Sequence, residues 1–271
     1  MLRQRVVTAT FLVAGFLAAL FWAPPSLWWL LVVCATALAA REWAGLAGFS
    51  LFGGLIFVVS TAFLGGVAGW LAQTLPEHDW ICAVYAVSVL FWVFVAPLWL
   101  AKRWVLGGPL RAVLTGWVVL VPIALALAHV REVGAVLLLG AMSLVWVADM
   151  AAYFSGRAFG RRKLAPSISP GKTREGAYGA ILGVIVVGLI YRALGGETGL
   201  SAQPWPAWLI ALLVLTVLSI LGDLFESLLK RQAGVKDSGN LLPGHGGVLD
   251  RIDSLAPTLP LIGLIILWAG R

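Results

Sequence analysis

Residues 205–221 read WPAWLIALLVLTVLSIL, and this stretch contains no charged residue. It is followed directly by Gly222-Asp223-Leu224-Phe225-Glu226, in which two acids appear within one helical turn. A helix needs about 20 mostly apolar residues to cross a bilayer. The stretch therefore predicts a membrane-spanning helix that ends at a charged boundary.

The rest of the chain has the same character. Of its 271 residues, 61% are hydrophobic and 11% are charged, whereas a soluble domain carries about 25% charged residues. We therefore predict an all-α, polytopic integral membrane protein with a bundle of about nine transmembrane helices. The predicted spans are residues 6–22, 27–40, 51–75, 80–100, 113–128, 133–148, 176–194, 205–221 and 255–270.

The positive charge of the chain is unevenly distributed. Its net charge is +7, but no nucleic-acid-binding motif accompanies that charge, so we expect no nucleic acid partner. If the N-terminus is cytoplasmic and nine spans alternate, the far side receives only Arg131, Arg192 and Arg271 of the 19 Lys and Arg residues. This positive-inside asymmetry predicts an N-in, C-out topology. The compact chain without an organelle signal favours the cell inner (cytoplasmic) membrane.

The polar residues are concentrated in two segments of the second half of the chain. Residues 1–130 are predicted to form N-terminal membrane helices, about five spans, and residues 131–271 a catalytic membrane region. Its polar segments, 149–175 and 223–254, both fall on the cytoplasmic side of the predicted topology, so they can meet. Elsewhere, the glycine pairs Gly65/Gly69 and Gly179/Gly183 have the spacing that lets helices approach closely.

The first polar segment, 149–175, has six basic residues against two acids, a net charge of +4. Glycines within it allow tight turns that bring backbone N–H groups near a ligand, which suits phosphate binding. The alternative is a positive-inside anchor or a patch for anionic lipid headgroups. However, Ser167–Glu175, SISPGKTRE, combines hydroxyl residues, proline and glycine with its charges, and a simple anchor needs only the charges. Gly171-Lys172-Thr173 is not part of a Walker A loop, because Pro166 stands where that motif requires glycine.

The second polar segment, 223–254, has five acids against four bases, a net charge of −1. Asp223 and Glu226 are spaced i,i+3 with Ser227 at i+4, so one helix face carries all three. Asp250 and Asp253 repeat the i,i+3 spacing. Carboxylates at a membrane boundary are costly unless they are paired or bind a cation. The alternative is simple pairing with neighbouring bases, but an oxygen-only ligand set favours a hard cation such as Mg²⁺.

One segment is thus basic and the other acidic, as expected for a metal–nucleotide site in which acids hold the cation and bases hold phosphates. The second segment contains Ser227-x-x-Lys230-Arg231, then Lys236-Asp237, then Pro243-x-His245-Gly246-Gly247-x-x-Asp250-Arg251-x-Asp253. This pattern resembles the signature of the CDP-diacylglycerol synthase (phosphatidate cytidylyltransferase) family without departure. The stretch from Asp149 to Glu175 is also similar to a well-marked region of that family.

The resemblance implies a nucleotidyltransferase of phospholipid biosynthesis, which transfers CMP from CTP to phosphatidate and releases CDP-diacylglycerol and pyrophosphate. It implies Mg²⁺ as cofactor, suggests a second, monovalent cation such as K⁺, and implies a homodimer. Direct in-line attack by the phosphatidate phosphate needs no general base, because that nucleophile is already anionic at neutral pH.

We expect the following roles on this basis. The catalytic residues are Asp223, Ser227, Lys230, Asp250 and Asp253, and the metal ligands are Asp223, Glu226, Asp250 and Asp253. The substrate-binding residues are Lys172, Thr173, Arg174, Lys230, Arg231, Lys236, His245, Gly246, Gly247 and Arg251. Considered alone, His245 is as much a turn hydrogen-bonder as a ligand.

Other classes fit less well. A CTP-dependent enzyme with an isoprenoid or other lipid acceptor would keep the same chemistry. A CDP-alcohol phosphotransferase is disfavoured because its series of aspartates, opening Asp-Gly and followed by Ala-Arg, is absent. A transporter would place ionisable groups near the bilayer midplane, often with matched interruptions in two halves, whereas here the acids lie at span ends and neither motif has a second copy.

Overall fold

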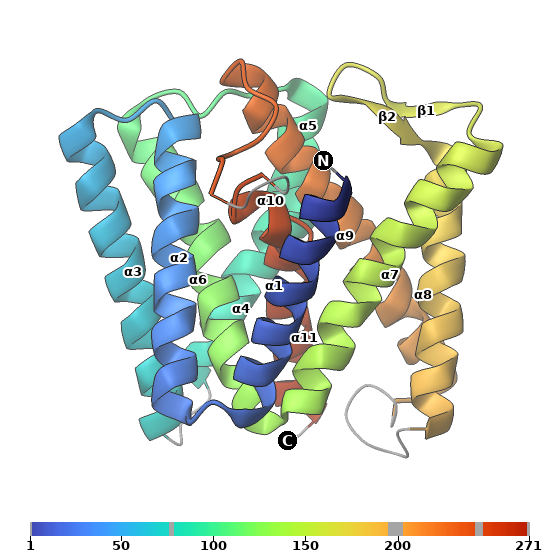
Figure 1. Ribbon diagram of the computed structural model, residues 1–271, viewed down its shortest axis with the longest axis horizontal. Helices are drawn as coiled ribbons and strands as arrows, with labels where there is room; N and C mark the ends of the chain where they lie inside the picture. Colours follow the sequence, from blue (N-terminus) through green and yellow to red (C-terminus); the bar gives the residue numbers. More distant parts are fainter. Residues whose placement is uncertain (1, 76–78, 195–202, 242–245, 270–271) are drawn as a thin grey trace. The chain divides into compact units, whose positions relative to one another are not determined.

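The computed structural model describes residues 2–75, 79–194, 203–241 and 246–269 (Figure 1). These residues are helical apart from one two-stranded sheet and the connections between elements. The helices are α1 (Leu2–Trp22), α2 (Pro25–Leu46), α3 (Leu51–Thr74), α4 (Asp79–Leu90), the π-helical η1 (Phe91–Val95), α5 (Ala96–Lys102), α6 (Pro109–Val133), α7 (Ala135–Phe159), α8 (Arg174–Leu194), α9 (Trp205–Gln232), α10 (Leu249–Ile252) and α11 (Leu255–Ala269). The strands are β1 (Lys163–Ala165) and β2 (Ser169–Thr173).

The helices agree with the predicted multi-pass membrane protein. Within the residues that the structure describes, seven helices are long and apolar enough to cross a bilayer, with α4, η1 and α5 forming one continuous candidate, Asp79–Lys102. Two further apolar helices, Thr10–Trp22 and Leu255–Ala269, are shorter. All nine predicted apolar runs coincide with helices, so the all-α class is confirmed, while the count of nine spans and the N-in, C-out topology stay predictions.

Two helices extend beyond the apolar runs that predicted them. The run at 133–148 lies in α7, which continues to Phe159, and the run at 205–221 lies in α9, which continues to Gln232. The purely apolar sequence ends at these points, but backbone hydrogen bonding continues through the more polar residues because their side chains also tolerate a helix. Asp149 and Asp223 therefore lie within helices rather than in loops.

A short antiparallel hairpin joins α7 to α8. Strands β1 and β2 pair with Lys163 opposite Thr173 and Ala165 opposite Ser169. The Thr173 hydroxyl accepts the Gly176 backbone N–H at 3.1 Å and so caps the first turn of α8, as side chains preceding helices commonly do. The hairpin thus leads directly into a capped membrane helix, with Lys172 one residue before the cap.

The described chain divides into two compact units. Unit 1 comprises Met1–Ile81, Val105–Leu138 and Leu229–Ile252, and unit 2 comprises Cys82–Trp104, Leu139–Leu228 and Asp253–Arg271. Each unit therefore combines segments that are distant in sequence, and α9 passes from unit 2 into unit 1 between Leu228 and Leu229.

Small residues bring α2, α3 and α6 of unit 1 together, and these helices lie side by side (Figure 1). A Cβ atom added to Gly65 would lie 3.1 Å from the Ala124 Cβ, and one added to Gly69 would lie 3.2 Å from the Trp29 ring. The indole of Trp43 donates a hydrogen bond to the Ala112 carbonyl at 3.1 Å. The expected close approach at Gly65 and Gly69 is thus confirmed.

In unit 2, the same kind of packing joins α7 to α8. A Cβ at Gly179 would overlap the Ser155 side chain, and one at Gly183 would lie 2.8 Å from the Ala151 Cβ, which confirms the second glycine pair. On α9, Phe225 makes edge-on contacts with Phe91, Trp92 and Trp99, with centroid separations of 5.4–5.7 Å. This buried aromatic anchor fixes the rotation of α9 at the turn that carries Asp223 and Glu226.

Candidate functional site

The first group of polar side chains lies in unit 2 and is called the Asp223 cluster: Lys172, Asp223 and Ser227. Lys172 of β2 forms an ion pair with Asp223 Oδ2 on α9. The Ser227 hydroxyl, one turn further along α9, donates to Asp223 Oδ1 at 3.2 Å. The predicted meeting of the basic and acidic segments is therefore confirmed through this pair.

A helix glycine brings the segment before α11 against the same turn of α9. A Cβ at Gly222 would overlap the Asp253 carbonyl oxygen and lie 2.9 Å from the Pro257 ring. The Asp253 carboxylate accepts the Ser254 backbone N–H at 2.7 Å. Glu226 is buried on α9, at 4% exposure. The backbone of Asp253 thus lies beside Gly222, the neighbour of Asp223.

The second group lies in unit 1 and is called the Asp250 cluster: Lys230, Ser238, Gly247 and Asp250. Lys230 Nζ, near the end of α9, lies 2.5 Å from Asp250 Oδ1. The other carboxylate oxygen, Oδ2, accepts the Ser238 backbone N–H and hydroxyl, both at 2.9 Å, and the Gly247 N–H at 2.8 Å. One oxygen of Asp250 is thus held by the loop, and the other faces a lysine.

These partners determine the charge state of Asp250. Burial raises the pKa of its carboxyl, but the hydrogen bond from Lys230, the Gly247 amide, the Lys230 charge and the Ser238 amide together hold the pKa below its ordinary value. The lysine and aspartate side chains are 12% and 6% exposed in this pair, against 25% and 30% for Lys172 and Asp223. The Asp250 pair is therefore less screened by solvent than the Asp223 pair.

The glycines of the signature shape the backbone around Asp250. Gly246 has a φ of +82°, a conformation that L side chains rarely adopt, and a Cβ there would lie 2.7 Å from Asp250 Oδ2. Gly247 is buried, and its N–H is one of the three donors to that same oxygen. Both glycines therefore allow the loop to close onto the carboxylate.

The other residues expected to bind substrate differ in their surroundings. Thr173 is buried and caps α8. Glu175 accepts the backbone N–H groups of Arg161 and Arg162 at 3.1–3.3 Å, which ties the start of α8 to the end of α7. The exposed cationic side chains are Arg174, Arg231, Lys236 and Arg251. His245 lies outside the described residues.

One residue of this region was not expected from the sequence. Glu42, near the end of α2, accepts the backbone N–H groups of Val248 at 3.0 Å and Leu249 at 2.8 Å, and the Ser238 hydroxyl at 3.0 Å. It is separated from Leu249 by 207 positions, so no local motif connects them. The available signal was an acid lying just beyond an apolar run, where an unpaired carboxylate would be costly.

The grouping of possible metal ligands can be compared among the described residues. In the described part of the chain, no three His, Cys, Asp or Glu side chains are grouped so that they could hold one. Each cluster instead pairs one aspartate with one lysine. The arrangement can balance anionic phosphates with lysines and offer hard oxygen atoms to a cation that other ligands also bind.

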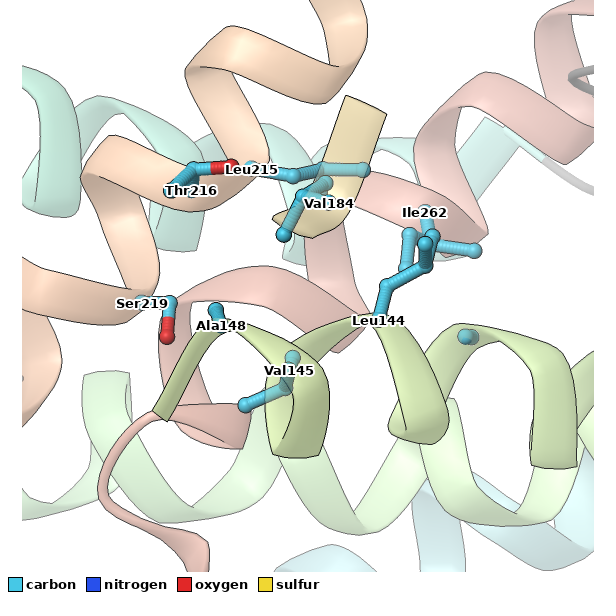
Figure 2. A pocket seen from close by; sticks show the side chains of 9 residues that line it. Leu144, Val145, Ala148, Val184, Leu215, Thr216, Ser219 and Ile262 are labelled. Atoms are coloured by element: carbon cyan, nitrogen blue, oxygen red, sulfur yellow. The ribbon is translucent and has the colours of Figure 1, made fainter. Parts of the chain in front are cut away.

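One turn before Asp223 on α9, Ser219 lines a small cavity in unit 2 (Figure 2). The other lining residues, from α7, α8, α9 and α11, are Ala141, Leu144, Val145, Ala148, Val184, Leu215, Thr216 and Ile262. The Ser219 hydroxyl has no hydrogen-bond partner among the described residues. The cavity volume is about 10 Å³, which is about the size of one water molecule, so it cannot hold an acyl chain.

Besides the Lys172–Asp223 and Lys230–Asp250 pairs, the chain shows similarity to known proteins over its whole length. Residues 3–268 match the cytidylyltransferase family. The chain belongs to this family. It is 38% identical to the phosphatidate cytidylyltransferase of Pseudomonas aeruginosa over an alignment of 281 residues, covering 100% of this chain and 98% of the relative.

Two further relatives carry the same name. That of Haemophilus influenzae is 37% identical over 283 aligned residues, with 96% of each chain covered. That of Brucella suis is 49% identical over 122 residues, which cover 45% of this chain and 43% of the relative. The similarity to the first two relatives thus covers nearly the whole chain. In the shorter alignment, close to half of the aligned residues are identical.

Proposed function

We propose that this membrane protein is a phosphatidate cytidylyltransferase, which converts CTP and phosphatidate into CDP-diacylglycerol and pyrophosphate. The observation that carries this proposal is the full-length similarity to relatives of that name. The Lys172–Asp223 and Lys230–Asp250 pairs support it, because nucleotidyl transfer requires phosphate charges to be neutralised and positioned.

The reaction is a direct in-line displacement. An oxygen of the phosphatidate phosphate forms a bond to the α-phosphorus of CTP, and the bond from that phosphorus to the oxygen that bridges the α- and β-phosphates breaks, so that this oxygen leaves as part of pyrophosphate. The nucleophile is already an anion at neutral pH, so no residue has to remove a proton. Pyrophosphate leaves as an anion, and the enzyme forms no covalent intermediate.

The side chains of the chain neutralise and orient these anions. Lys172 and Lys230 are held by carboxylates in the described state, and each can exchange that partner for a phosphate oxygen. The exposed cations Arg174, Arg231, Lys236 and Arg251 attract CTP and the lipid headgroup. Ser227 holds Asp223 and can donate to a phosphate instead. Thr173 keeps Lys172 in place by capping α8.

A Mg²⁺ ion fits this donor set as a partner of the nucleotide. Mg²⁺ usually binds through one or two carboxylates, several waters and substrate phosphates rather than through an all-protein cage. Asp223 and Asp250 each offer carboxylate oxygens in hydrogen-bonded settings, with Glu226 and Asp253 as supporting candidates. When bound, the metal neutralises charge developing on the transferring phosphate. K⁺ is a candidate for a second, monovalent cation.

The membrane arrangement that suits this function has nine spans, with the N-terminus inside and the C-terminus outside the inner membrane. Almost all Lys and Arg residues then face the cytoplasm. Soluble CTP reaches the site from that side, and phosphatidate reaches it at headgroup depth within the membrane. The active form is a homodimer, and its product supplies phospholipid synthesis.

Purified protein in detergent, given phosphatidate, radiolabelled CTP and Mg²⁺, tests the proposal. We expect label in the lipid phase, and its loss with EDTA or with Asp250→Ala. Glu132→Gln, which changes an exposed carboxylate at the end of α6, is the matched control and should leave transfer intact. Folded wild-type protein that labels no phosphatidate would refute the proposal, and isoprenoid phosphates would then be tested as acceptors.

A further inference from the structure

The carboxylate of Glu42 contacts residues on the chain segments that precede Asp250, namely Ser238, Val248 and Leu249. Oε1 accepts Val248 N–H, and Oε2 accepts Leu249 N–H. Oε2 also lies 3.0 Å from the Ser238 hydroxyl oxygen, whose single proton can be donated either to it or to Asp250 Oδ2. Glu42 is located on α2, whereas its partners lie about 200 positions later, so the contact joins a helix of the first half of the chain to the signature loop of the second. All of these residues belong to unit 1.

The shape of the loop provides independent evidence that it is built around this side chain. A Cβ at Gly239 would lie 2.5 Å from Glu42 Oε1, and a Cβ at Gly247 would overlap Glu42 Oε2. Real Cβ atoms essentially never come this close to a neighbour. The Glu42 carboxylate is therefore contacted by hydrogen-bond donors of this loop. It also lies so close to Gly239 and Gly247 that neither position has space for a side chain.

The same donors connect Glu42 to Asp250. Three consecutive amides point to carboxylates: Gly247 N–H to Asp250 Oδ2, and those of Val248 and Leu249 to Glu42. The Ser238 hydroxyl lies within hydrogen-bonding distance of both acids, 3.0 Å from Glu42 Oε2 and 2.9 Å from Asp250 Oδ2. A displacement of Glu42 therefore moves the groups that fix Asp250.

We propose that Glu42 is a positioning residue for nucleotide transfer: it holds Ser238 and the backbone of Val248 and Leu249 so that Asp250 Oδ1 and Lys230 face the substrate. The backbone N–H groups of Ser238 and Gly247 donate to Asp250 Oδ2, and the Ser238 hydroxyl also lies next to that oxygen. Oδ1, which contacts only Lys230 among these groups, is then the oxygen that can exchange the lysine for a cation. The inference rests on the proposed function, because it assigns Glu42 a part in that reaction.

The test compares Glu42→Gln with wild type in the labelled-CTP assay. In wild type, the Val248 and Leu249 N–H groups donate to different oxygens of Glu42. The glutamine amide has only one acceptor oxygen, so one of these two N–H groups loses its partner. Loss of a group that orients a ligand residue typically costs 10–100-fold in activity or affinity. We expect kcat/KM for CTP to fall roughly tenfold or more, with little change in the KM for phosphatidate. Glu132→Gln should behave as wild type.

Two further measurements separate positioning from folding. Gly247→Ala inserts a methyl group against the same carboxylate, and the Glu42→Gln/Gly247→Ala double variant should be little worse than the poorer single variant, because both disturb one contact. Melting in detergent should show Glu42→Gln still folded at the assay temperature. If its activity equals that of wild type, or if its whole loss follows the loss of folded protein, the inference is wrong. Inactive wild type would instead refute the proposed function.

Discussion

Both aspartates on which the proposed chemistry depends are already engaged with a lysine. Asp223 pairs with Lys172 from a different element, and Asp250 pairs with Lys230. A lysine ammonium is compact and has three donors, so it can move from a carboxylate to a phosphate without a large rearrangement. In the proposed reaction, the lysines of both pairs turn from these carboxylates to the anionic substrates. Breaking one partner of such a pair leaves the other charge without compensation, so each pair both supports the fold and supplies charged groups that can turn to a substrate.

The charge on Asp250 gives a stability test. Because folding lowers the pKa of Asp250 below its ordinary 3.8, the carboxylate stabilises the fold fully above that ordinary value, and this contribution is lost as the pH falls through the folded-state value. Near neutral pH, in EDTA and without substrate, we expect wild type to have a higher melting temperature than Asp250→Asn. This difference in melting temperature, the gap, should shrink only below about pH 4. Circular dichroism melts across this range measure the gap. A gap that is independent of pH down to about pH 3 would contradict the assignment, and Glu132→Gln controls for general acid effects.

At the scale of elements, hydropathy predicted where helices lie but not how far they run. The apolar runs at 133–148 and 205–221 predicted α7 and α9, but both helices continue for several turns beyond these runs into more polar sequence. The i,i+3 spacing of Asp223 and Glu226 was interpretable because it is local. Three other features could not be predicted from the sequence: the hairpin of β1 and β2, the cap at Thr173 and the contact between Glu42 and Leu249. Each depends on how the folded chain arranges its residues.

Because α7 packs closely on α8, we expect Gly179→Ala to destabilise the protein, although alanine has a higher helix propensity than glycine. Alanine favours a helix over glycine by about 0.5–1 kcal/mol, but a Cβ at Gly179 would overlap Ser155. Overpacking of this kind costs about 1–3 kcal/mol, so Gly179→Ala should lower the melting temperature by several degrees. Gly15→Ala is the matched control, because Gly15 of α1 has open space around its Cβ position. Equal melting temperatures for the two variants would show that α7 and α8 are not packed this tightly.

At the scale of the molecule, the two clusters belong to different units, and α9 contributes to both. Asp223 and Ser227 lie on the part of α9 in unit 2, and Lys230 lies on the part in unit 1. Each unit also contains residues from separated stretches of sequence: Lys172 joins α9 in one, and Glu42 joins the Asp250 loop in the other. The residues assigned to the proposed chemistry therefore come from both units, and Glu42 of the first half of the chain is proposed to position one of them.

The sparse carboxylates of each unit lead to a prediction about metal binding. Because no three acidic or other ligating side chains of these types gather in the described part of the chain, the protein alone should bind Mg²⁺ weakly. A nucleotide supplies the missing oxygens, and such coupling is reciprocal. Titration calorimetry of Mg²⁺ into detergent-solubilised protein should therefore show weak binding alone and clearly tighter binding with a non-reactive CTP analogue, after the analogue's own Mg²⁺ binding is subtracted. Asp223→Asn and Asp250→Asn should reduce the gain, whereas Glu132→Gln should keep it. Tight Mg²⁺ binding in the absence of nucleotide would mean that the protein supplies a complete ligand cage, and the substrate-assisted arrangement would have to be abandoned.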